Sequence, residues 1–369
     1  MDRPGINWRY FDFLLLGAVA ILAIFGIAMI RSAIAGNIEL LELNLVGRQI
    51  IFLIGGLAVI FITTAIDYHL WSAISRPMYF GMAALLAILT IVGAAVFGSA
   101  RWFDTGVILI QPSELAKIVV ILVLADFFTQ NQAKIHNLGT IARSLIWTGG
   151  IVIWILLQPN LSTSIVIMVI WFALLWASGL QIKHLIMFAG IGILIIIVSY
   201  PFLVDYQQQR ILNFLFPDPD APHGELYNIQ QALITIGSGG WFGKGYGLGS
   251  QTQLRFLKVR HTDFIFSAMA EEFGFIGIAV IMLLLVFVIY RVLRAARLAR
   301  DTFGALICYG VAAMIAFQAI VNIGVNLNML PATGLTLPFV SYGGSSLLSL
   351  LLGIGLVESV IVRHKTLEF

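Results

Sequence analysis

Charged residues and cysteines are scarce in this chain. Asp, Glu, Lys and Arg make up 11% of the 369 residues, against about 25% in a typical soluble domain. Hydrophobic residues make up 60%, and the mean hydropathy is +0.99. This composition excludes an ordinary soluble domain and indicates an integral membrane protein. The single cysteine, Cys308, excludes a disulfide framework, and the His and Cys residues do not show the spacing of a zinc site.

Long hydrophobic runs fill most of the chain. A helix needs about 20 apolar residues to cross the bilayer core, and the first run is longer than the roughly 7–15-residue apolar region of a signal peptide. We therefore interpret this run as a membrane helix. We predict an all-α integral membrane protein, a single polytopic domain over residues 1–369, with ten transmembrane helices at 11–30, 49–66, 77–97, 114–129, 143–158, 161–180, 184–204, 263–290, 303–325 and 338–362.

The distribution of basic residues predicts the orientation of these spans. Ten spans place both termini on one side, and cytoplasmic termini would put more than half of the 21 basic residues in cytoplasmic segments. The positive-inside rule therefore favours cytoplasmic termini and a large extracytoplasmic loop at 205–262. Four regularly spaced arginines contribute to this count, and we expect them to contact anionic headgroups or to make a specific regulatory contact: Arg291, Arg294, Arg297 and Arg300.

Ionisable residues gather near the outer ends of the predicted spans. An ionisable residue inside a span costs about 2.5–3.5 kcal/mol on insertion scales, so it needs a partner or a function. Pro112 marks the start of a helix, and Glu114 and Lys117 are three residues apart, on one helical face. Together with Arg101 they form either a structural ion pair or the wall of a polar cavity that faces the outer leaflet.

A second group of charges lies where the loop at 205–262 meets the next apolar run. Arg255, Lys258, Arg260 and Asp263 follow one another within nine residues. Thr262-Asp263 before an apolar helix is typical of an N-cap. The same position suits a proton acceptor, since a helix N-terminus stabilises a carboxylate while burial raises its pKa. The two roles are compatible.

The glycine-rich segment 237–249 does not fit a nucleotide-binding loop. Lys244 is followed by Gly rather than by Ser or Thr, as a Walker motif requires. We expect an ordered loop over a site, with Trp241, Phe242 and Tyr246 at the membrane interface. Aromatic residues elsewhere are scattered through the spans and are not interleaved with a basic soluble patch, so no nucleic-acid partner is expected.

Five motifs along the chain together resemble the SEDS family (shape, elongation, division and sporulation proteins). They are Gly98-Ser-Ala-Arg101-Trp102; Gln111-Pro-Ser-Glu114-Leu-Ala-Lys117; Gly237-Ser-Gly-Gly-Trp-Phe-Gly-Lys-Gly; His261-Thr-Asp263-Phe-Ile-Phe with Glu271-Glu-Phe-Gly; and Pro331-Ala-Thr-Gly-Leu-Thr-Leu-Pro-Phe-Val-Ser341-Tyr-Gly-Gly-Ser345-Ser. The segment 249–257 is more similar to the RodA elongation branch than to the FtsW division branch. Two positions depart from the family pattern: Asn160 stands in place of Asp, and Lys258-Val259 in place of Pro-Glu.

This resemblance implies peptidoglycan glycosyltransferase activity on lipid II at the bacterial cytoplasmic membrane, for cell-wall elongation and rod shape. It implies a class B penicillin-binding protein as partner, together with other membrane proteins of the elongation complex. Asp263 matches the essential aspartate of the family. A divalent cation, Mg or Mn, is a candidate ligand of Asp263, and no organic cofactor is expected.

The chemistry of lipid II explains why one carboxylate suffices. The donor sugar is α-linked to a lipid pyrophosphate and the product is β-linked, so a single inverting displacement needs a base but no strong acid. Glu271 would lie roughly 12 Å along a helix from Asp263, beyond the about 6.5–9.5 Å of an inverting glycosidase pair. We predict Asp263 as the base. The candidate substrate-binding residues are Arg48, Arg101, Trp102, Gln111, Ser113, Glu114, Lys117, Asn160, Arg210, Lys244, Lys258, Arg260, His261, Thr262, Glu271, Ser341 and Ser345.

Two other functions fit parts of the pattern. A lipid II flippase or another transporter would also need a polar cavity, but it predicts charges through the whole depth of the bilayer. A non-enzymatic scaffold for a penicillin-binding protein would leave Arg101, Lys117 and Asp263 without a role. The position of the charges near the outer ends of spans favours chemistry at the outer leaflet.

Overall fold

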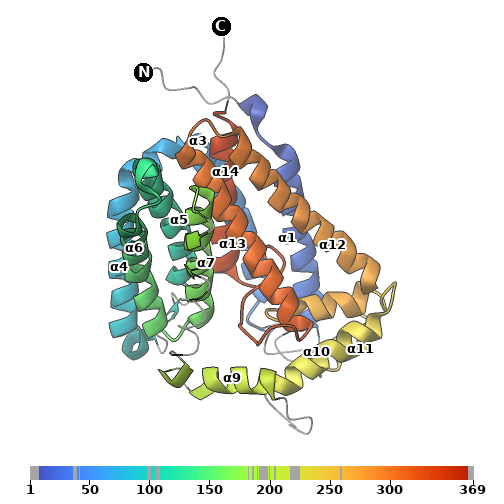
Figure 1. Cartoon of the computed structure of the whole chain (residues 1–369). Coiled ribbons are helices and arrows are strands. Elements are labelled where there is room, and N and C mark those ends of the chain that lie inside the picture. Colours follow the sequence, from blue (N-terminus) through green and yellow to red (C-terminus); the bar gives the residue numbers. More distant parts are fainter. Residues whose placement is uncertain are drawn as a thin grey trace.

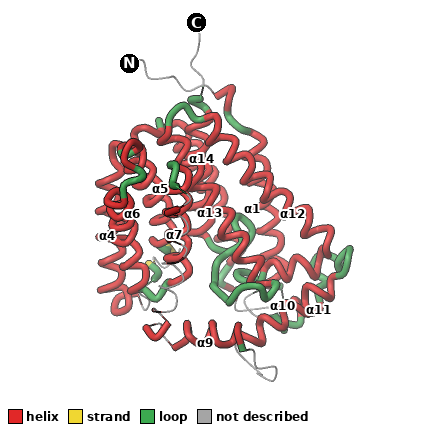
Figure 2. The backbone as a smooth tube through the Cα atoms, in the orientation of Figure 1, coloured by secondary structure: helices red, strands yellow, loops and turns green. Residues whose placement is uncertain are grey.

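The computed structural model is almost entirely helical in the part of the chain that it describes (Figures 1 and 2). Its one small sheet is an antiparallel pair, β1 (Phe103–Asp104) and β2 (Leu109–Ile110), in which Phe103 lies opposite Ile110. The described residues are 8–35, 40, 42–97, 101–104, 109–181, 183–184, 187–188, 190, 198, 200–202, 205–216, 225–257 and 260–364.

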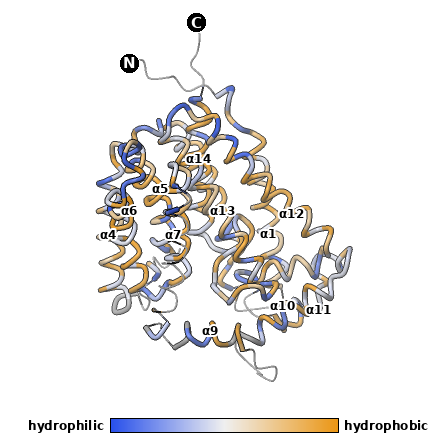
Figure 3. Tube along the Cα trace, in the orientation of Figure 1, coloured by the Kyte–Doolittle hydropathy of each residue, from blue (hydrophilic) through white to orange (hydrophobic). Residues whose placement is uncertain are grey.

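Seven helices among the described residues are long and apolar enough to cross a membrane. Hydrophobic residues cover their length, and hydrophilic residues concentrate at the turns at the top of the view (Figure 3). Two further helices pack among them, α5 (Pro112–Gln130), which carries buried charges, and the shorter α7 (Leu161–Ala177). The seven are α1 (Phe13–Ile34), α3 (Leu45–Ala65), α4 (Tyr68–Phe97), α6 (Leu138–Leu157), α12 (Ile265–Leu298), α13 (Thr302–Asn326) and α14 (Gly344–Ile361).

The predicted spans coincide with these helices, apart from the span at 184–204, which lies largely outside the described residues. The predicted start at residue 77 was wrong, because α4 begins at Tyr68 and contains Pro77. Polar residues in its first turns mask the helix in a hydropathy count. Ser72 and Ser75 of this stretch donate to the carboxylate of Asp126 on α5, at 2.5 and 3.3 Å, so the polar face is buried and bonded.

The last predicted span also begins later than expected. Residues 338–343 form turns, and α14 starts only at Gly344. Phe339 has a φ of 65°, in the left-handed region, and the hydroxyl of Ser341 accepts from the backbone N–H of Leu337 at 2.9 Å. This side-chain bond offers the backbone an alternative to the helix.

The segment 205–262, predicted as a loop, contains helices. They are α9 (Asp205–Leu215), α10 (Glu225–Gly239) and the short α11 (Ser250–Gln253), and they lie at the lower end of the molecule in Figure 1. Helix α10 packs against α12 and buries Ile229, Ala232 and Thr235. This three-residue spacing places the buried residues on one face of the helix.

The first and last described residues meet at the opposite end of the molecule. The rings of Tyr10 and His364 are 4.8 Å apart, and the backbone N–H of Asp12 donates to Glu358 on α14 at 3.0 Å. Arg291 forms an ion pair of 2.5 Å with Asp12. The expected headgroup contact was therefore wrong for Arg291, because this arginine instead ties α12 to the N-cap of α1.

Small residues bring α3 and α14 into close contact, and the two are the most extensively packed pair. A Cβ at Gly355 would collide with Thr63, and one at Gly56 would collide with Leu351. Glycines allow helix backbones to approach closely in this way in membrane proteins. The pairing places the start of α14 next to Gln49, whose side chain accepts from the N–H of Gly343 at 3.3 Å.

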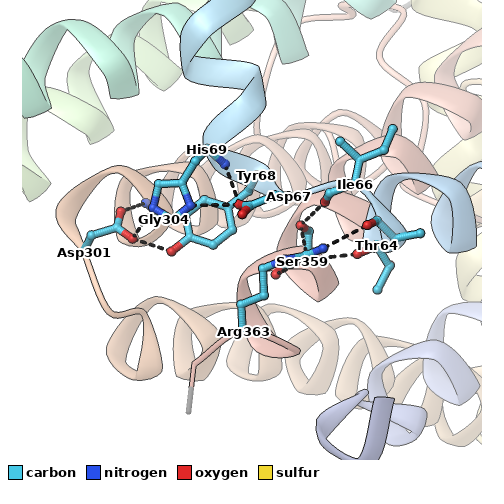
Figure 4. A network of polar contacts seen from close by, with 10 residues as sticks. Thr64, Ile66, Asp67, Tyr68, His69, Asp301, Gly304, Ser359 and Arg363 are labelled. Atoms are coloured by element: carbon cyan, nitrogen blue, oxygen red, sulfur yellow. Dashed lines mark hydrogen bonds and ion pairs between the residues drawn. The ribbon is translucent and has the colours of Figure 1, made fainter. Parts of the chain in front are cut away.

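The buried Arg363 fastens the other end of this helix pair (Figure 4). Its guanidinium donates to the carbonyls of Thr64 and Ala65, both at 2.9 Å, and to Ser359. The two carbonyls belong to the last turn of α3, where carbonyls have no partner within the helix. Arg363 is thus a cap for α3 that is supplied by the chain beyond α14.

A second group of contacts in Figure 4 joins two turns of the chain. His69 lies between Asp67 and Asp301, with ring nitrogens 2.8 and 3.2 Å from their carboxylates. Tyr68 donates to the same carboxylate of Asp301, which also caps α13 through the N–H of Gly304 at 2.8 Å. The α3–α4 turn is therefore bonded to the start of α13.

Replacement of Arg363 by Ala should lower the thermal stability clearly. It leaves buried carbonyls without donors, at a cost of about 3 kcal/mol. The unfolding temperature of Arg363→Lys should lie between those of Arg363→Ala and the wild type, because Lys keeps the charge but lacks the planar guanidinium group. Thermal unfolding in nanodiscs measures both. Arg297→Ala is the matched control, since Arg297 is exposed, and an equal loss in the control would contradict the capping role.

Helix α12 is broken at Gly274, whose φ and ψ are 66° and −169°. The break frees backbone groups that the glycine-rich segment binds. The N–H groups of Lys244 and Gly245 donate to the carbonyls of Glu271 and Glu272, both at 2.9 Å. In the opposite direction, the N–H groups of 275 and 276 donate to the carbonyls of 240 and 241 at 2.9 and 3.2 Å. Four backbone groups at the break therefore find partners in the glycine-rich segment.

Gly274→Ala should destabilise the protein, because this backbone conformation is essentially restricted to glycine, at a cost of about 1–3 kcal/mol. A Cβ there would also collide with the backbone of Gly243. Gly17→Ala in α1 is the control, since a Cβ at Gly17 meets no atom within 4 Å. We expect a lower unfolding temperature for the first variant only. Equal temperatures would show that the break is not a constraint.

Candidate functional site

The candidate site lies at the end of the bundle that carries α9 to α11, where several helices begin. The segment 327–343 connects them. Its carbonyl at Thr333 accepts from Ser162 in the first turn of α7. The side chain of Asn322, on α13, donates to the carbonyl of Leu335 at 2.7 Å. Ser341 in the same segment donates to the carbonyl of Thr262 at 2.7 Å. The starts of α7, α12 and α14 are thus held in one network.

Asp263 sits one residue before the N-cap of α12. The expectation that Thr262-Asp263 is the N-cap was wrong, because the N-cap is Phe264 and no side chain caps it. The carbonyl of Asp263 accepts from the side-chain amides of Asn322 and Asn326, at 3.0 and 2.9 Å. The backbone of the candidate base is therefore fixed by two buried asparagines.

The carboxylate of Asp263 faces the segment 327–343. A Cβ at Gly334 would lie 3.8 Å from its Oδ2 atom, and Gly334 has a φ of 73°. The side chain of Asp263 is partly exposed. A residue with a side chain at Gly334 would therefore have a strained backbone, and its Cβ would be in van der Waals contact with the carboxylate.

The residues directly before Asp263 are held by their backbone. The backbone N–H of Tyr342 donates to the carbonyl of His261 at 2.9 Å. Arg260 is 5% exposed and donates to the carbonyls of Ala33 and Leu257, at 2.5 and 3.3 Å. These carbonyls orient the guanidinium but do not neutralise its charge. Lys258 lies outside the described residues.

The start of α5 contributes a buried ion pair. The ammonium group of Lys117 lies 2.8 Å from the carboxylate of Glu114, and Lys117 is fully buried. Asn160 caps α7 by accepting from the N–H of Thr163 at 3.3 Å, and its amide donates to Ser113 of α5 at 3.4 Å. Asn160 thus links the two helix starts, a capping role that an Asp side chain could also fill.

Arg101 holds the turn before α7. It donates to the carbonyls of Gln158 and Pro159, at 2.7 and 2.6 Å. Trp102 follows it directly, before β1. At the other end of this hairpin, the N–H of Gln111 donates to Ser345 of α14 at 3.0 Å. Arg101 therefore joins the hairpin to the turn before α7, and the bond between Gln111 and Ser345 joins it to α14.

Helix α3 contributes one predicted candidate, Arg48, and one residue that was not predicted, Gln49. Arg48 lies beside the hydroxyl of Tyr342; burial raises the pKa of this hydroxyl and Arg48 opposes the rise. Gln49 is buried, and its amide donates to the carbonyl of Ser341 at 3.4 Å. Gln49 and Asn322 were not predicted from the sequence as parts of the site. Amide side chains inside apolar runs were the available signal, since buried amides need partners.

Three candidates lie elsewhere in this part of the protein. Lys244 forms an ion pair of 2.8 Å with Glu271, whose carboxylate is completely buried. Arg210 lies on α9, which packs against α10. None of the three is joined to Asp263 by the network above, which reaches Asp263 through Asn322 and Asn326.

Metal ligands do not cluster in the described part of the chain. It contains no group of three or more His, Cys, Asp or Glu residues that could hold a metal ion. Asp263 offers a single carboxylate. Mg is commonly bound by one or two carboxylates together with substrate phosphates, rather than by a full set of protein ligands. The donor set therefore does not form a resident metal site.

His261 is neutral at physiological pH. Burial, reinforced by the charge of Arg260, lowers its pKa from 6.5 to about 4. Between these two values the unfolded chain binds a proton at this position that the folded chain resists. The free energy of unfolding therefore rises with pH across this window. Above pH 6.5 the histidine is neutral in both states, and its protonation no longer opposes folding.

We expect the wild type to lose thermal stability more steeply than His261→Gln when the pH falls from 6.5 to 4.5. The variant lacks the group whose protonation opposes folding. Unfolding temperatures in nanodiscs, measured in steps of half a pH unit, test this. Parallel curves for the two proteins would show that His261 does not titrate in this window.

Taken together, the fold and the site define a multi-pass membrane protein in which the backbone of one aspartate, Asp263, is fixed at one end of the helix bundle. Residues 12–366 match the family described as "Cell cycle protein", FtsW/RodA/SpoVE. The chain is 35% identical to the peptidoglycan glycosyltransferase MrdB of Escherichia coli K12, over 94% of this chain and 92% of that protein. It is also 35% identical to the probable peptidoglycan glycosyltransferase FtsW of Hydrogenovibrio crunogenus, over 97% and 94%.

Solved structures show the same fold. The rod shape determining protein RodA of Thermus thermophilus superposes with a TM-score of 0.71 at 31% identity, over 98% of this chain and 99% of that one. A chain of a peptidoglycan synthase complex, in which polymerization and crosslinking are coordinated, gives a TM-score of 0.81 at 31% identity, over 96% and 98%. This protein belongs to the FtsW/RodA/SpoVE family and is RodA-like, as the motifs indicated.

Proposed function

We propose that this chain is a peptidoglycan glycosyltransferase that polymerises lipid II into glycan strands, with Asp263 as the base. The observation that carries the proposal is the fixed position of Asp263 at the start of α12. Two asparagines hold its backbone, while its carboxylate faces Gly334 and is partly exposed. MrdB and FtsW, which share about a third of the sequence, are named as peptidoglycan glycosyltransferases.

The reaction needs one proton acceptor. The carboxylate of Asp263 accepts the proton of the attacking sugar hydroxyl as this oxygen bonds to the anomeric carbon. The bond from that carbon to the pyrophosphate oxygen breaks on the opposite face, which inverts the configuration. A positioned base contributes about 10²–10⁴-fold to such a step.

The leaving pyrophosphate needs positive charge rather than a proton. Arg260 lies three residues from Asp263 and is bound by neutral carbonyls, so those contacts leave its charge available for electrostatic stabilisation. Lys117 is neutralised in part by Glu114. Arg48, Arg101 and Lys258 complete the proposed set of cations near the start of α12. A divalent cation would arrive with the substrate phosphates, with Asp263 as its one carboxylate; the steps above are carried by side chains alone.

The proposal extends to the setting of the reaction. Ten transmembrane helices in one polytopic domain, with cytoplasmic termini, would place Asp263 at the outer leaflet of the bacterial cytoplasmic membrane. The meeting of the first and last described residues at one end supports an even number of crossings. A class B penicillin-binding protein is the proposed partner, because a similar chain occurs in a complex where polymerization and crosslinking are coordinated. Cell-wall elongation and rod shape are the proposed role.

Asp263→Asn should reduce polymer formation from labelled lipid II by at least 100-fold, because the amide cannot accept the proton. The assay uses the full chain in nanodiscs, with and without a penicillin-binding protein. Glu42→Gln is the control, since it removes an exposed carboxylate at the same end of the bundle. Wild-type activity in Asp263→Asn would overturn the assignment. Movement of lipid II across the membrane without polymer would instead support a flippase, and neither activity would support a scaffold.

A further inference from the structure

Glu271 joins the glycine-rich segment to α12 more extensively than an ion pair requires. It lies in the first part of α12, before the break at Gly274, and its carboxylate is completely buried. Its Oε1 atom accepts from Lys244 Nζ and from the backbone N–H of Gln251, both at 2.8 Å. The hydroxyls of Ser250 and Ser238 also donate to this atom, at 3.3 and 3.4 Å.

The second oxygen of Glu271 is bound as fully as the first. Its Oε2 atom accepts from the backbone N–H of Thr252 at 3.0 Å and from the hydroxyl of Thr252 at 2.8 Å. A Cβ at Gly249 would collide with this atom, so the chain passes directly over the carboxylate. A group that is enclosed and bonded in this way has no room for a substrate sugar or phosphate. Glu271 therefore acts on its own chain.

The segment that Glu271 holds leads directly to the candidate base. The bonds of Glu271 fix residues 250–252. Ten residues later, the backbone of residues 261–263 is fixed by Tyr342, Ser341, Asn322 and Asn326. Between these two anchors lie Arg255 and Arg260, along with Lys258. The backbone N–H groups of 254, 255 and 257 bond back to residues 250–252, and Arg260 donates to the carbonyl of Leu257. The anchor at 250–252 therefore extends to both arginines, and Arg260 is held in addition by the carbonyl of Ala33.

We propose that Glu271 is a positioning residue for the glycosyl transfer: by binding residues 250–252 to α12 it sets the position of the cationic segment relative to Asp263. This inference rests on the proposed function. A carboxylate is required because each of its oxygens faces a backbone N–H, and Oε1 also faces the ammonium group of Lys244; these groups only donate, and an ionised carboxylate only accepts. A glutamine would turn an N–H₂ group toward one of these donors and force the segment away. A displacement of about 1 Å at a reacting site can cost roughly 100-fold in rate.

The test compares Glu271→Gln with Glu272→Gln in full-length protein in nanodiscs. Glu272 is the matched control, because it is the next residue on the same helix and about as buried, but it accepts from Ser32 of α1 and binds the backbone of Gly247 rather than residues 250–252. Polymerisation of labelled lipid II gives kcat and KM, and hydrogen exchange reports on the amides of 250–263. We expect Glu271→Gln to lower kcat about 10- to 100-fold with KM within threefold, and to speed exchange in 250–263 only. The control should keep kcat within threefold.

Each other outcome contradicts the inference. Unchanged kcat in Glu271→Gln would show that the anchor does not matter for the reaction. A raised KM with unchanged kcat would indicate direct contact with the substrate. Faster exchange throughout α13 and α14 would indicate a general structural role. If Glu271→Gln does not fold, Thr252→Val replaces it, since it removes one hydroxyl donor and keeps the shape; a three- to tenfold lower kcat is expected. An inactive wild type would refute the proposed function itself, and so is distinct from these results.

Discussion

The need to bond every backbone polar group governs this structure. In a membrane an unbonded N–H or carbonyl has no water to turn to, so a broken helix persists only where other protein groups replace its lost bonds. The break at Gly274 meets this condition because the segment 240–245 supplies both donors and acceptors. The same requirement explains Arg363, which supplies donors to the last carbonyls of α3. In both places, backbone groups that a helix leaves unbonded bind to a second segment of the chain.

The break shapes the site because it divides α12 into two parts. The first part carries Glu271 near the break and begins directly after Asp263, while the second part runs on toward the end of the molecule that holds Asp12 and Arg291. The glycine-rich segment packs against the break and continues into α11. One backbone irregularity thus binds the glycine-rich segment to α12.

Three cations in the described structure have a carboxylate partner. Lys117 pairs with Glu114, Lys244 with Glu271, and Arg291 with Asp12. The buried Arg260 and Arg363 differ, because their described contacts are with carbonyls and, for Arg363, with Ser359. Arg363 caps α3, whereas Arg260 lies three residues from Asp263, where a positive charge would stabilise an anionic substrate group.

The sequence by itself determined the class of protein and the helical spans within the described residues, and it made Asp263 the candidate base. Hydropathy and motif order are local properties, so they can be read without a structure. The spacing of three residues placed Glu114 and Lys117 on one helical face and left an ion pair or a polar cavity wall as alternatives; the structure shows the ion pair. Helix starts were less accurate, because the polar first turns of α4 are bonded to Asp126 from a distant part of the chain.

Only the tertiary structure decided what each polar residue does. Gln49, Asn322 and Asn326 are far from Asp263 in sequence, and their amides reach the site because α3, α13 and α14 pack together. Glu271 looked like a candidate for substrate binding until its carboxylate was seen enclosed by residues 238–252. A sequence shows which groups can donate or accept hydrogen bonds, but their partners depend on contacts between distant parts of the chain. The partners in turn decide whether a polar residue can bind substrate or holds its own chain in place.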